Sequence, residues 1–126
     1  MEVTTILIGD VVVLKLLGEL RSRDSIASDF WTYLHKGKSK FVVNLENVRM
    51  INSVGLSALL EFKRLSEASG GGVVLCNISG EVRKVMKVTR LDQIFVICED
   101  EDLALAGFIK GLPLVRTESA VSRHRN

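Results

Sequence analysis

The stretch that decides the fold lies between residues 41 and 56, where the chain reads FVVNL at residues 41–45 and INSVGL at residues 51–56. The first segment is apolar at almost every position, which is typical of a strand covered on both faces. The second places Asn52 and Ser53 directly before a helical pattern of apolar residues. We therefore expect a buried strand that turns sharply into a helix, and we call residues 52–55 the serine corner. Ser53 would lie at a helix N-terminus, where free backbone N–H groups and the helix dipole favour negative charge.

The part of the chain before the serine corner predicts a hairpin and a helix. β-Branched residues dominate residues 3–8 and 11–17, and the Gly9-Asp10 pair between them is a two-residue turn signal. We expect Gly18 to end the second strand. Apolar residues then follow at helical spacing over residues 26–34. The residues that offer capping oxygens to this helix are Ser22, Asp24 and Ser25.

The part of the chain after the serine corner continues the alternation of strands and helices. The helix that begins there is expected over residues 54–69, and a run of three glycines ends it. Further elements are expected as a strand at 73–78, a helix at 80–89, a strand at 94–97 and a last helix from the acidic turn at 99–102. This order predicts an α/β fold with a mixed sheet of about five strands. Its first hairpin is antiparallel, and right-handed crossovers join the later strands.

Length and composition describe one ordinary globular domain. The chain has 126 residues, of which 47% are hydrophobic and 25% are charged. Its net charge of +2 comes from the arginines near the end of the chain. We expect a domain over residues 1–110 and a short, flexible basic tail over residues 111–126. A domain with balanced charge lacks the clustered cations of a nucleic-acid surface, so we do not expect nucleic acid as a partner.

Segments for membrane insertion or secretion are not evident in the sequence. No apolar run approaches the ~20 residues of a membrane span, and the N-terminus lacks the pattern of a signal peptide. Cys76 and Cys98 lie in apolar, strand-like segments and form no CxxC motif. We therefore expect a cytoplasmic protein that does not insert into a membrane and keeps both thiols reduced.

Three interpretations of Ser53 are open on the residues alone. The first is structural, with Asn52 or Ser53 as a helix N-cap worth about 1 kcal/mol. The second is a catalytic nucleophile, but Ile51 stands where the G-x-S-x-G motif requires its first glycine. A nucleophile also needs a histidine base, and the chain has only His35 and His124. We expect no catalytic residue, no cofactor and no metal site, because the scattered histidines and cysteines supply no ligand cluster.

The third interpretation is a phosphorylation switch. A phosphate on Ser53 would add a charge of about −1.5 to −2 at a helix end whose dipole tolerates it. The domain would keep its fold, and the cost would fall on a partner that covers the serine corner and has to bury the charge. A loss of about 2.7 kcal/mol is a hundredfold in affinity, and burial of an unpaired charge readily reaches that loss.

Four stretches, taken in order, carry a resemblance to a known family. They are Gly18-Glu19-Leu20; residues 42–48 together with residues 51–56; residues 74–77; and residues 82–86 leading to residues 91–95. On these residues the chain resembles the STAS-domain proteins of the anti-sigma-factor antagonist family over about residues 3–108. The block around Ser53 is the most specific part. The resemblance implies a STAS-like mixed sheet with helices packed mainly on one face.

The resemblance also implies a function in bacterial transcription regulation. In such proteins the unphosphorylated antagonist binds an anti-sigma factor that is also an ATP-dependent serine kinase, and so frees the sigma factor. Phosphorylation of the serine that matches Ser53 breaks this complex, and a serine phosphatase restores it. The antagonist is a substrate and ligand of the kinase and has no enzymatic activity. The alternative is a non-switching STAS subunit of a lipid ABC transporter or of a signalling scaffold.

The chain departs from the family pattern beside Ser53. The family usually has Asp-Ser-Ser/Thr-Gly where this chain has Asn52-Ser53-Val54-Gly55. Asn52 keeps the capping ability of the aspartate without its negative charge, and Val54 leaves Ser53 as the only hydroxyl at the serine corner. The segment Arg21-Ser22-Arg23-Asp24 also differs, because the family often has an aspartate soon after Gly-x-Leu.

A partner surface is expected around the serine corner. Leu56 and Leu60 lie one turn apart on the flank of the predicted helix, and their packing inside the domain or against a partner is left open. The residues expected to contact a partner are Asn52, Val54, Gly55, Leu56, Leu60, Glu61 and Arg64. A homodimer is a further arrangement to be tested.

Overall fold

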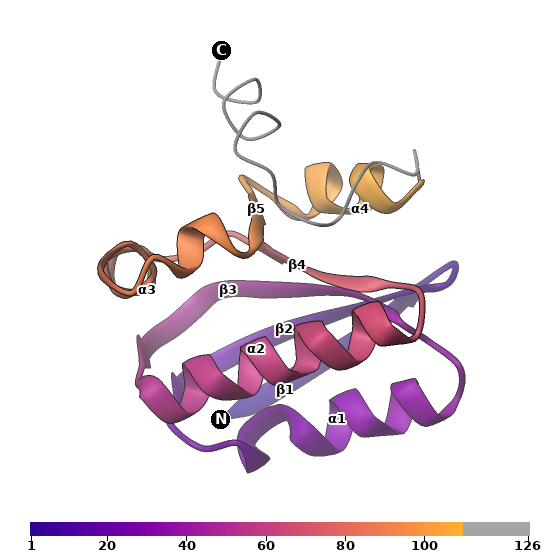
Figure 1. The fold of residues 1–126 in the computed structure, drawn as a ribbon, viewed down its shortest axis with the longest axis horizontal. Coiled ribbons are helices and arrows are strands. Elements are labelled where there is room, and N and C mark those ends of the chain that lie inside the picture. The colour runs from indigo at the N-terminus through magenta and orange to yellow at the C-terminus, as the bar shows by residue number, and fades with distance from the viewer. Residues whose placement is uncertain (110–126) are drawn as a thin grey trace.

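A five-stranded sheet with the strand order β1-β2-β3-β4-β5 forms the centre of the protein in the computed structural model, which describes residues 1–109 (Figure 1). The strands are β1 (Glu2–Ile8), β2 (Val11–Leu20), β3 (Lys40–Ile51), β4 (Gly72–Cys76) and β5 (Val96–Cys98). The helices are α1 (Asp24–His35), α2 (Ser53–Ala68), α3 (Gly80–Val88), α4 (Glu101–Ile109) and the short 3-10 helix η1 (Leu91–Gln93). β1 pairs with β2 antiparallel, and every later pair is parallel. The predicted mixed sheet with an antiparallel first hairpin is therefore confirmed.

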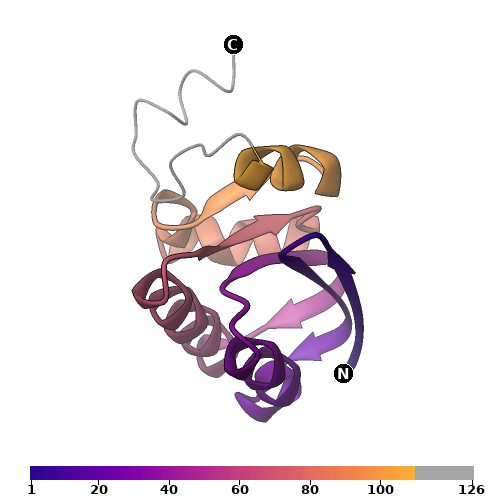
Figure 2. The ribbon, with the colours of Figure 1, turned by 90° about the vertical axis from the view of Figure 1, so that its right-hand side faces the viewer.

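The two faces of the sheet are covered unequally, as Figures 1 and 2 show. The helices α1, α2 and α3 pack on one face. There the ring centroid of Phe30 lies 4.3 Å from that of Phe62 and 4.7 Å from that of Phe41. The helix α4 covers part of the other face through Ala104 and Phe108. Because side chains alternate along β3, its apolar run supplies both cores, which explains why residues 41–45 show almost no polar interruption.

Two strands are longer than the sequence indicates. β2 continues through Gly18 to Leu20, and β3 continues from Leu45 to Ile51. These extensions pair with each other in parallel, with register shifts on either side of Leu17 and Gly18. Gly18 has φ of +126°, a conformation that glycine adopts without strain, so here it bends the strand and does not end it. The consequence is that β3 delivers the chain directly to the serine corner.

The start of α1 also differs from the expectation. Arg23 is the N-cap residue, and its side chain makes no capping hydrogen bond. The capping oxygens expected from Ser22, Asp24 and Ser25 stay a prediction. The expected strand at 94–97 begins only at Val96, because η1 precedes it. The proposed domain boundary at residue 110 and the basic tail at 111–126 lie outside the described residues.

Candidate functional site

The serine corner is the turn between the end of β3 and the start of α2. The side-chain Oδ1 of Asn52 accepts a hydrogen bond from the backbone N–H of Gly55 at 3.0 Å, so Asn52 is the N-cap of α2. Ser53 is the first residue of the helix and its side chain is exposed. Within residues 1–109, no group forms a hydrogen bond with the Ser53 hydroxyl. The cap role that the sequence left open therefore belongs to Asn52, and the Ser53 hydroxyl has no structural duty.

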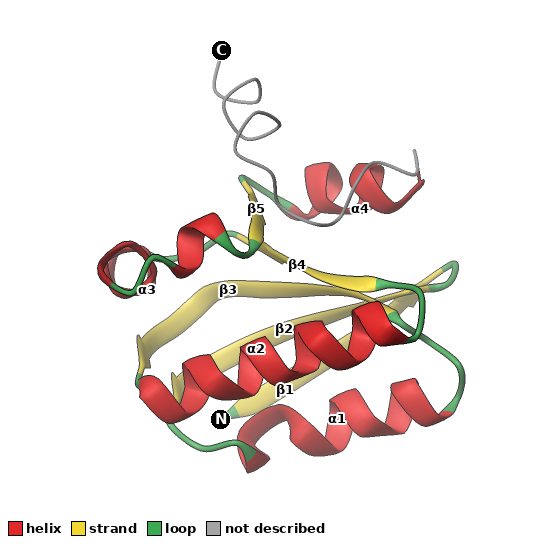
Figure 3. Ribbon diagram, viewed as in Figure 1, coloured by secondary structure: helices red, strands yellow, loops and turns green. Residues whose placement is uncertain are grey.

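The loop between β2 and α1 is fastened to the serine corner. The backbone N–H of Asn52 donates to the carbonyl oxygen of Leu20 at 3.2 Å, and its side-chain Nδ2 donates to the carbonyl oxygen of Arg21 at 3.4 Å. Figure 3 shows this loop beside the N-terminal end of α2. An aspartate could cap the helix but could not make the second bond, because a carboxylate has no donor. Asn52 thus holds both the helix and the neighbouring loop.

Gly55 is required by packing at the same place. A Cβ at this position would stand 2.9 Å from Cγ of Leu20 and far inside van der Waals distance of the Leu20 carbonyl oxygen. The first turn of α2 therefore approaches the end of β2 more closely than any other residue type allows. The glycine two residues after Ser53 thus has a structural reason that does not involve a nucleophile turn.

Ser53 and the residues expected to contact a partner fall into three groups by exposure. Ser53, Val54 and Arg64 are exposed, and Val54 has 49% of its surface accessible. Asn52, Leu60 and Glu61 are partly buried. Gly55 and Leu56 are buried, with Leu56 only 6% exposed within the main core. Of the two leucines left open by the sequence, Leu56 is a core residue and Leu60 reaches the surface.

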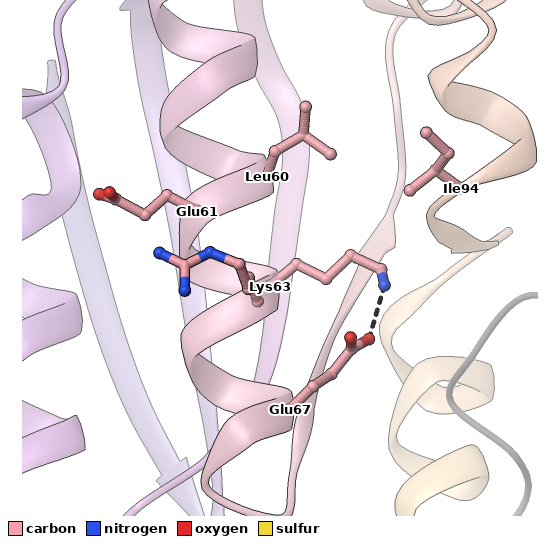
Figure 4. Close-up of a pocket in the computed structure, with 6 residues that line it drawn as sticks. Leu60, Glu61, Lys63, Glu67 and Ile94 are labelled. Atoms are coloured by element: carbon pink, nitrogen blue, oxygen red, sulfur yellow. Dashed lines mark hydrogen bonds and ion pairs between the residues drawn. The ribbon is translucent and has the colours of Figure 1, made fainter.

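A groove of about 440 Å³ runs along α2 beside the segment that joins α3 to β5 (Figure 4). Its lining consists of Leu60, Glu61, Lys63, Arg64, Glu67 and Ile94. Leu60 and Ile94 point toward each other across it, and Lys63 Nζ pairs with Glu67 Oε2 at 2.6 Å. The sequence reasoning missed Lys63, Glu67 and Ile94. A lysine at helical spacing from Leu56 and Leu59, on the buried side of the helix, was the available signal for Lys63.

A smaller pocket of about 150 Å³ lies along the first turns of α2, next to the serine corner. It is lined by Arg23, Val54, Ser57, Ala58 and Glu61. The guanidinium of Arg23 forms an ion pair with the carboxylate of Glu61, which joins the start of α1 to the third turn of α2. A basic residue from the β2–α1 loop therefore lies against the helix that carries Ser53.

Groups that could support other chemistry lie elsewhere. His35 is the last residue of α1, about 18 Å of helix away from the end that adjoins the serine corner. Burial raises the pKa of the Cys76 thiol to about 12, which removes it as a nucleophile at neutral pH. In residues 1–109, His, Cys, Asp and Glu form no cluster suited to a metal ion. None of the helices in this same part of the chain is long and apolar enough to span a bilayer.

Comparison with known proteins agrees with this geometry. A model of the STAS domain family matches residues 3–104. The chain belongs to the STAS domain family. This STAS protein is 25% identical over 115 residues to BtrV of Bordetella bronchiseptica, which is provisionally named an anti-sigma factor antagonist, and the match covers 90% of this chain and 99% of BtrV.

Solved STAS structures share the fold. One is the crystal structure of TM1081 from Thermotoga maritima, which is also provisionally named an anti-sigma factor antagonist. It matches with a TM-score of 0.72 and 27% sequence identity, over 82% of this chain and 92% of the TM1081 chain. The anti-sigma factor antagonist SpoIIAA of Bacillus, in its unphosphorylated form, has a TM-score of 0.68 and 22% identity over 88% of this STAS chain and all of SpoIIAA. At this identity the likeness to SpoIIAA is one of fold.

Proposed function

We propose that this STAS protein is an anti-sigma factor antagonist of the bacterial cytoplasm that binds an anti-sigma factor with serine kinase activity. Phosphorylation of Ser53 by that kinase releases it, and a serine phosphatase restores the binding form. The observation that carries the proposal is the division of roles at the serine corner. Asn52 caps α2, which leaves the Ser53 hydroxyl exposed and unbonded among the described residues at the positive end of the helix dipole.

Phosphorylation at this position is compatible with the fold. The hydroxyl of Ser53 projects from the first residue of α2, so a phosphate there would displace no core side chain and break no capping bond. Its charge would be favoured by the dipole and opposed by any partner lying over the serine corner. The protein acts as the substrate of the kinase and needs no catalytic residue of its own.

The proposed partner surface consists of the solvent-exposed residues on one side of α2. Val54, Arg64 and the accessible parts of Asn52, Leu60 and Glu61 present one side of α2 to the solvent, next to the groove described above. Gly55 and Leu56 support this surface from below. The exposed Val54 lies near the charged Glu61 and Arg64 on this side of α2. Protein–protein interfaces commonly combine an apolar centre with a polar rim in this way.

The direct test incubates the full chain with its kinase and ATP and locates the phosphate by mass spectrometry. We expect phosphate on Ser53 and none on the Ser53→Ala variant. Ser57→Ala is the matched control, because Ser57 is an exposed serine one turn along the same helix and its loss should change nothing. Absence of phosphate at Ser53 would overturn the proposal.

Binding gives a second, independent test. Ser53→Asp should weaken the complex with the kinase by roughly tenfold or more, whereas Ser53→Ala should bind and resist release by ATP. Equal affinities of the wild type and both variants would contradict the switch. Analytical ultracentrifugation of the free chain checks the homodimer, which stays a prediction.

One observation favours a second candidate. Asn52 replaces the aspartate that the family usually has beside its phosphoacceptor, and its amide is used to hold Arg21. This substitution suits a STAS subunit that does not switch, in a lipid ABC transporter or a signalling scaffold. Co-purification separates the two candidates: a kinase-type ATPase supports the antagonist, and an ABC ATPase supports the transporter subunit.

A further inference from the structure

A basic side chain at the serine corner has no role in the function proposed so far. Arg23 lies in the loop before α1, at a place where the sequence shows two arginines. Its guanidinium pairs with Glu61, and it shares the small pocket with Val54 and Ser57 on the first two turns of α2. The Arg23 side chain therefore lies along the helix that begins with Ser53.

Ser53 and Glu61, the ion-pair partner of Arg23, lie on the same side of α2. Ser53, Ser57 and Glu61 follow one another at intervals of four residues and so occupy one side of the helix. The rise from Ser53 to Glu61 is about 12 Å. Arg23 forms an ion pair with Glu61 at the far end of this stripe. It also lines the small pocket together with Ser57, at the middle of the stripe, and Val54, the neighbour of Ser53. Figure 4 shows the Glu61 side chain turned away from the groove toward α1.

We propose that Arg23 is a phosphate-binding residue of the switch, which exchanges Glu61 for the phosphate on Ser53. This inference rests on the phosphorylation of Ser53 proposed above. A phosphate offers up to two charges and three acceptor oxygens to the planar fork of an arginine, whereas Glu61 offers a single charge. The Arg23 side chain is 53% exposed, and an ion pair with such exposure is held weakly. The phosphate is therefore the stronger competitor.

When Arg23 exchanges Glu61 for the phosphate on Ser53, the charge balance changes at Glu61 as well as at Ser53. Arg23 neutralises part of the phosphate at the serine corner, and Glu61 loses its counter-ion. Glu61 belongs to the proposed partner surface, so the loss of its counter-ion changes the net charge of that surface. A modification at the end of the helix thereby changes the electrostatics two turns further on.

Arg21 is the other arginine of this loop, and the contacts distinguish it from Arg23. Its Nε pairs with Glu19 Oε1 at 3.2 Å, and its carbonyl oxygen accepts the bond from the Asn52 side chain. Arg21 does not line the small pocket on α2. Its contribution is to hold the loop, and Arg23 supplies the cation.

The test uses the full chain with phosphoserine incorporated at position 53 during synthesis, so that no kinase is needed. Phosphorus NMR follows the second pKa of the phosphate. We expect this pKa to be lower in the wild type than in Arg23→Gln by about half a unit. Lys40→Gln is the matched control, because Lys40 forms a surface ion pair with Asp10 at the opposite end of β3, and its loss should leave the phosphate pKa unchanged.

A double-mutant cycle isolates the exchange itself. Glu61→Gln should lower the phosphate pKa further, because Arg23 loses its other partner, and this effect should shrink when it is combined with Arg23→Gln. Arg23→Lys keeps the charge and should retain part of the shift, so it replaces Arg23→Gln if that variant does not fold.

Equal phosphate pKa values in the wild type and Arg23→Gln would overturn the role of Arg23. A larger effect of Arg21→Gln than of Arg23→Gln would overturn it as well. Neither measurement depends on a kinase or a partner protein. Failure of the proposed function, seen as an unphosphorylated Ser53 after incubation with kinase, is therefore a separate result from failure of this inference.

Discussion

The carbonyl oxygen of Leu20, at the end of β2, occupies the space in which Gly55 would carry a side chain. The same oxygen accepts the backbone hydrogen bond of Asn52, so the first turn of α2 is pressed against the neighbouring strand at two points. This contact fixes the height of the helix above the sheet. It also brings the β2–α1 loop, with Arg21 and Arg23, to the side of Ser53.

Replacing Gly55 by alanine should therefore destabilise the protein. We expect Gly55→Ala to lower the free energy of unfolding by about 1–3 kcal/mol, because the new Cβ forces α2 away from Leu20. Urea unfolding followed by circular dichroism measures the loss. Gly107→Ala is the control, since a Cβ at this position in α4 meets nothing within 4 Å, and this variant should gain up to about 1 kcal/mol from helix propensity. Equal stability of Gly55→Ala and the wild type would contradict the close approach.

The capping assignment makes a second prediction. Asn52→Ala should cost about 1 kcal/mol of stability, because the N–H of Gly55 loses its acceptor. Ser53→Ala should change stability by less than about 0.5 kcal/mol, since its hydroxyl makes no bond with the described residues. Chemical denaturation of both variants under the same conditions provides the comparison. A cost for Ser53→Ala as large as that for Asn52→Ala would show that the serine is the cap.

The buried thiol of Cys76 should be almost inert in the folded protein. Burial is the main cause that raises its pKa to about 12, with Glu101 as a smaller one, so the thiolate fraction at pH 8 is about one in ten thousand. In a Cys98→Ser variant, a disulfide reagent such as DTNB should label the native protein far more slowly than the urea-unfolded protein, and the native rate should rise with pH. Rapid labelling of folded Cys98→Ser would contradict the burial of Cys76.

The ion pair between Asp10 and Lys40 should make a small part of the stability depend on pH. The hydrogen bond from Lys40 Nζ, at 2.9 Å, is the main cause that holds the pKa of Asp10 below its usual 3.8. A carboxyl whose pKa is lower in the folded state stabilises it fully above the unfolded pKa, and this contribution is lost as the pH falls through the folded pKa. Carboxyl carbon NMR should show the Asp10 pKa rising in Lys40→Gln. The control is Lys36→Gln, which removes a lysine that lies over the ring of Tyr33. In this variant the pKa of Asp10 should be the same as in the wild type.

The order of strands and helices could be predicted because local patterns report burial directly. The apolar run at residues 41–45 had to be covered on both faces, and it is. The continuation of β3 to Ile51 was missed because exposed residues such as Glu46 and Arg49 interrupt the apolar pattern. That segment is a strand through its pairing with the end of β2, a long-range contact that no local pattern encodes.

Only the part of the candidate site that depends on local sequence patterns could be located in advance. Ser53 and its place at a helix start follow from local sequence, but the choice between Leu56 and Leu60 as the buried residue depends on where the neighbouring elements pack. The groove was not predictable, since Ile94 comes from a segment thirty-odd residues away in the chain. The ion pair of Arg23 with Glu61 likewise joins two helices whose contact only the fold creates.

The separation of the helix cap from the serine that we propose as the phosphoacceptor has an evolutionary consequence. Selection can act on Ser53 without acting on folding, because the hydrogen bond that starts α2 belongs to its neighbour. A lineage that loses the serine by one codon change keeps an intact domain, which under the proposed switch can no longer be phosphorylated at this position. A lineage that loses Asn52 damages the domain itself. Variation at these two adjacent codons should therefore differ among descendants of this gene, with the asparagine retained in copies whose serine has drifted.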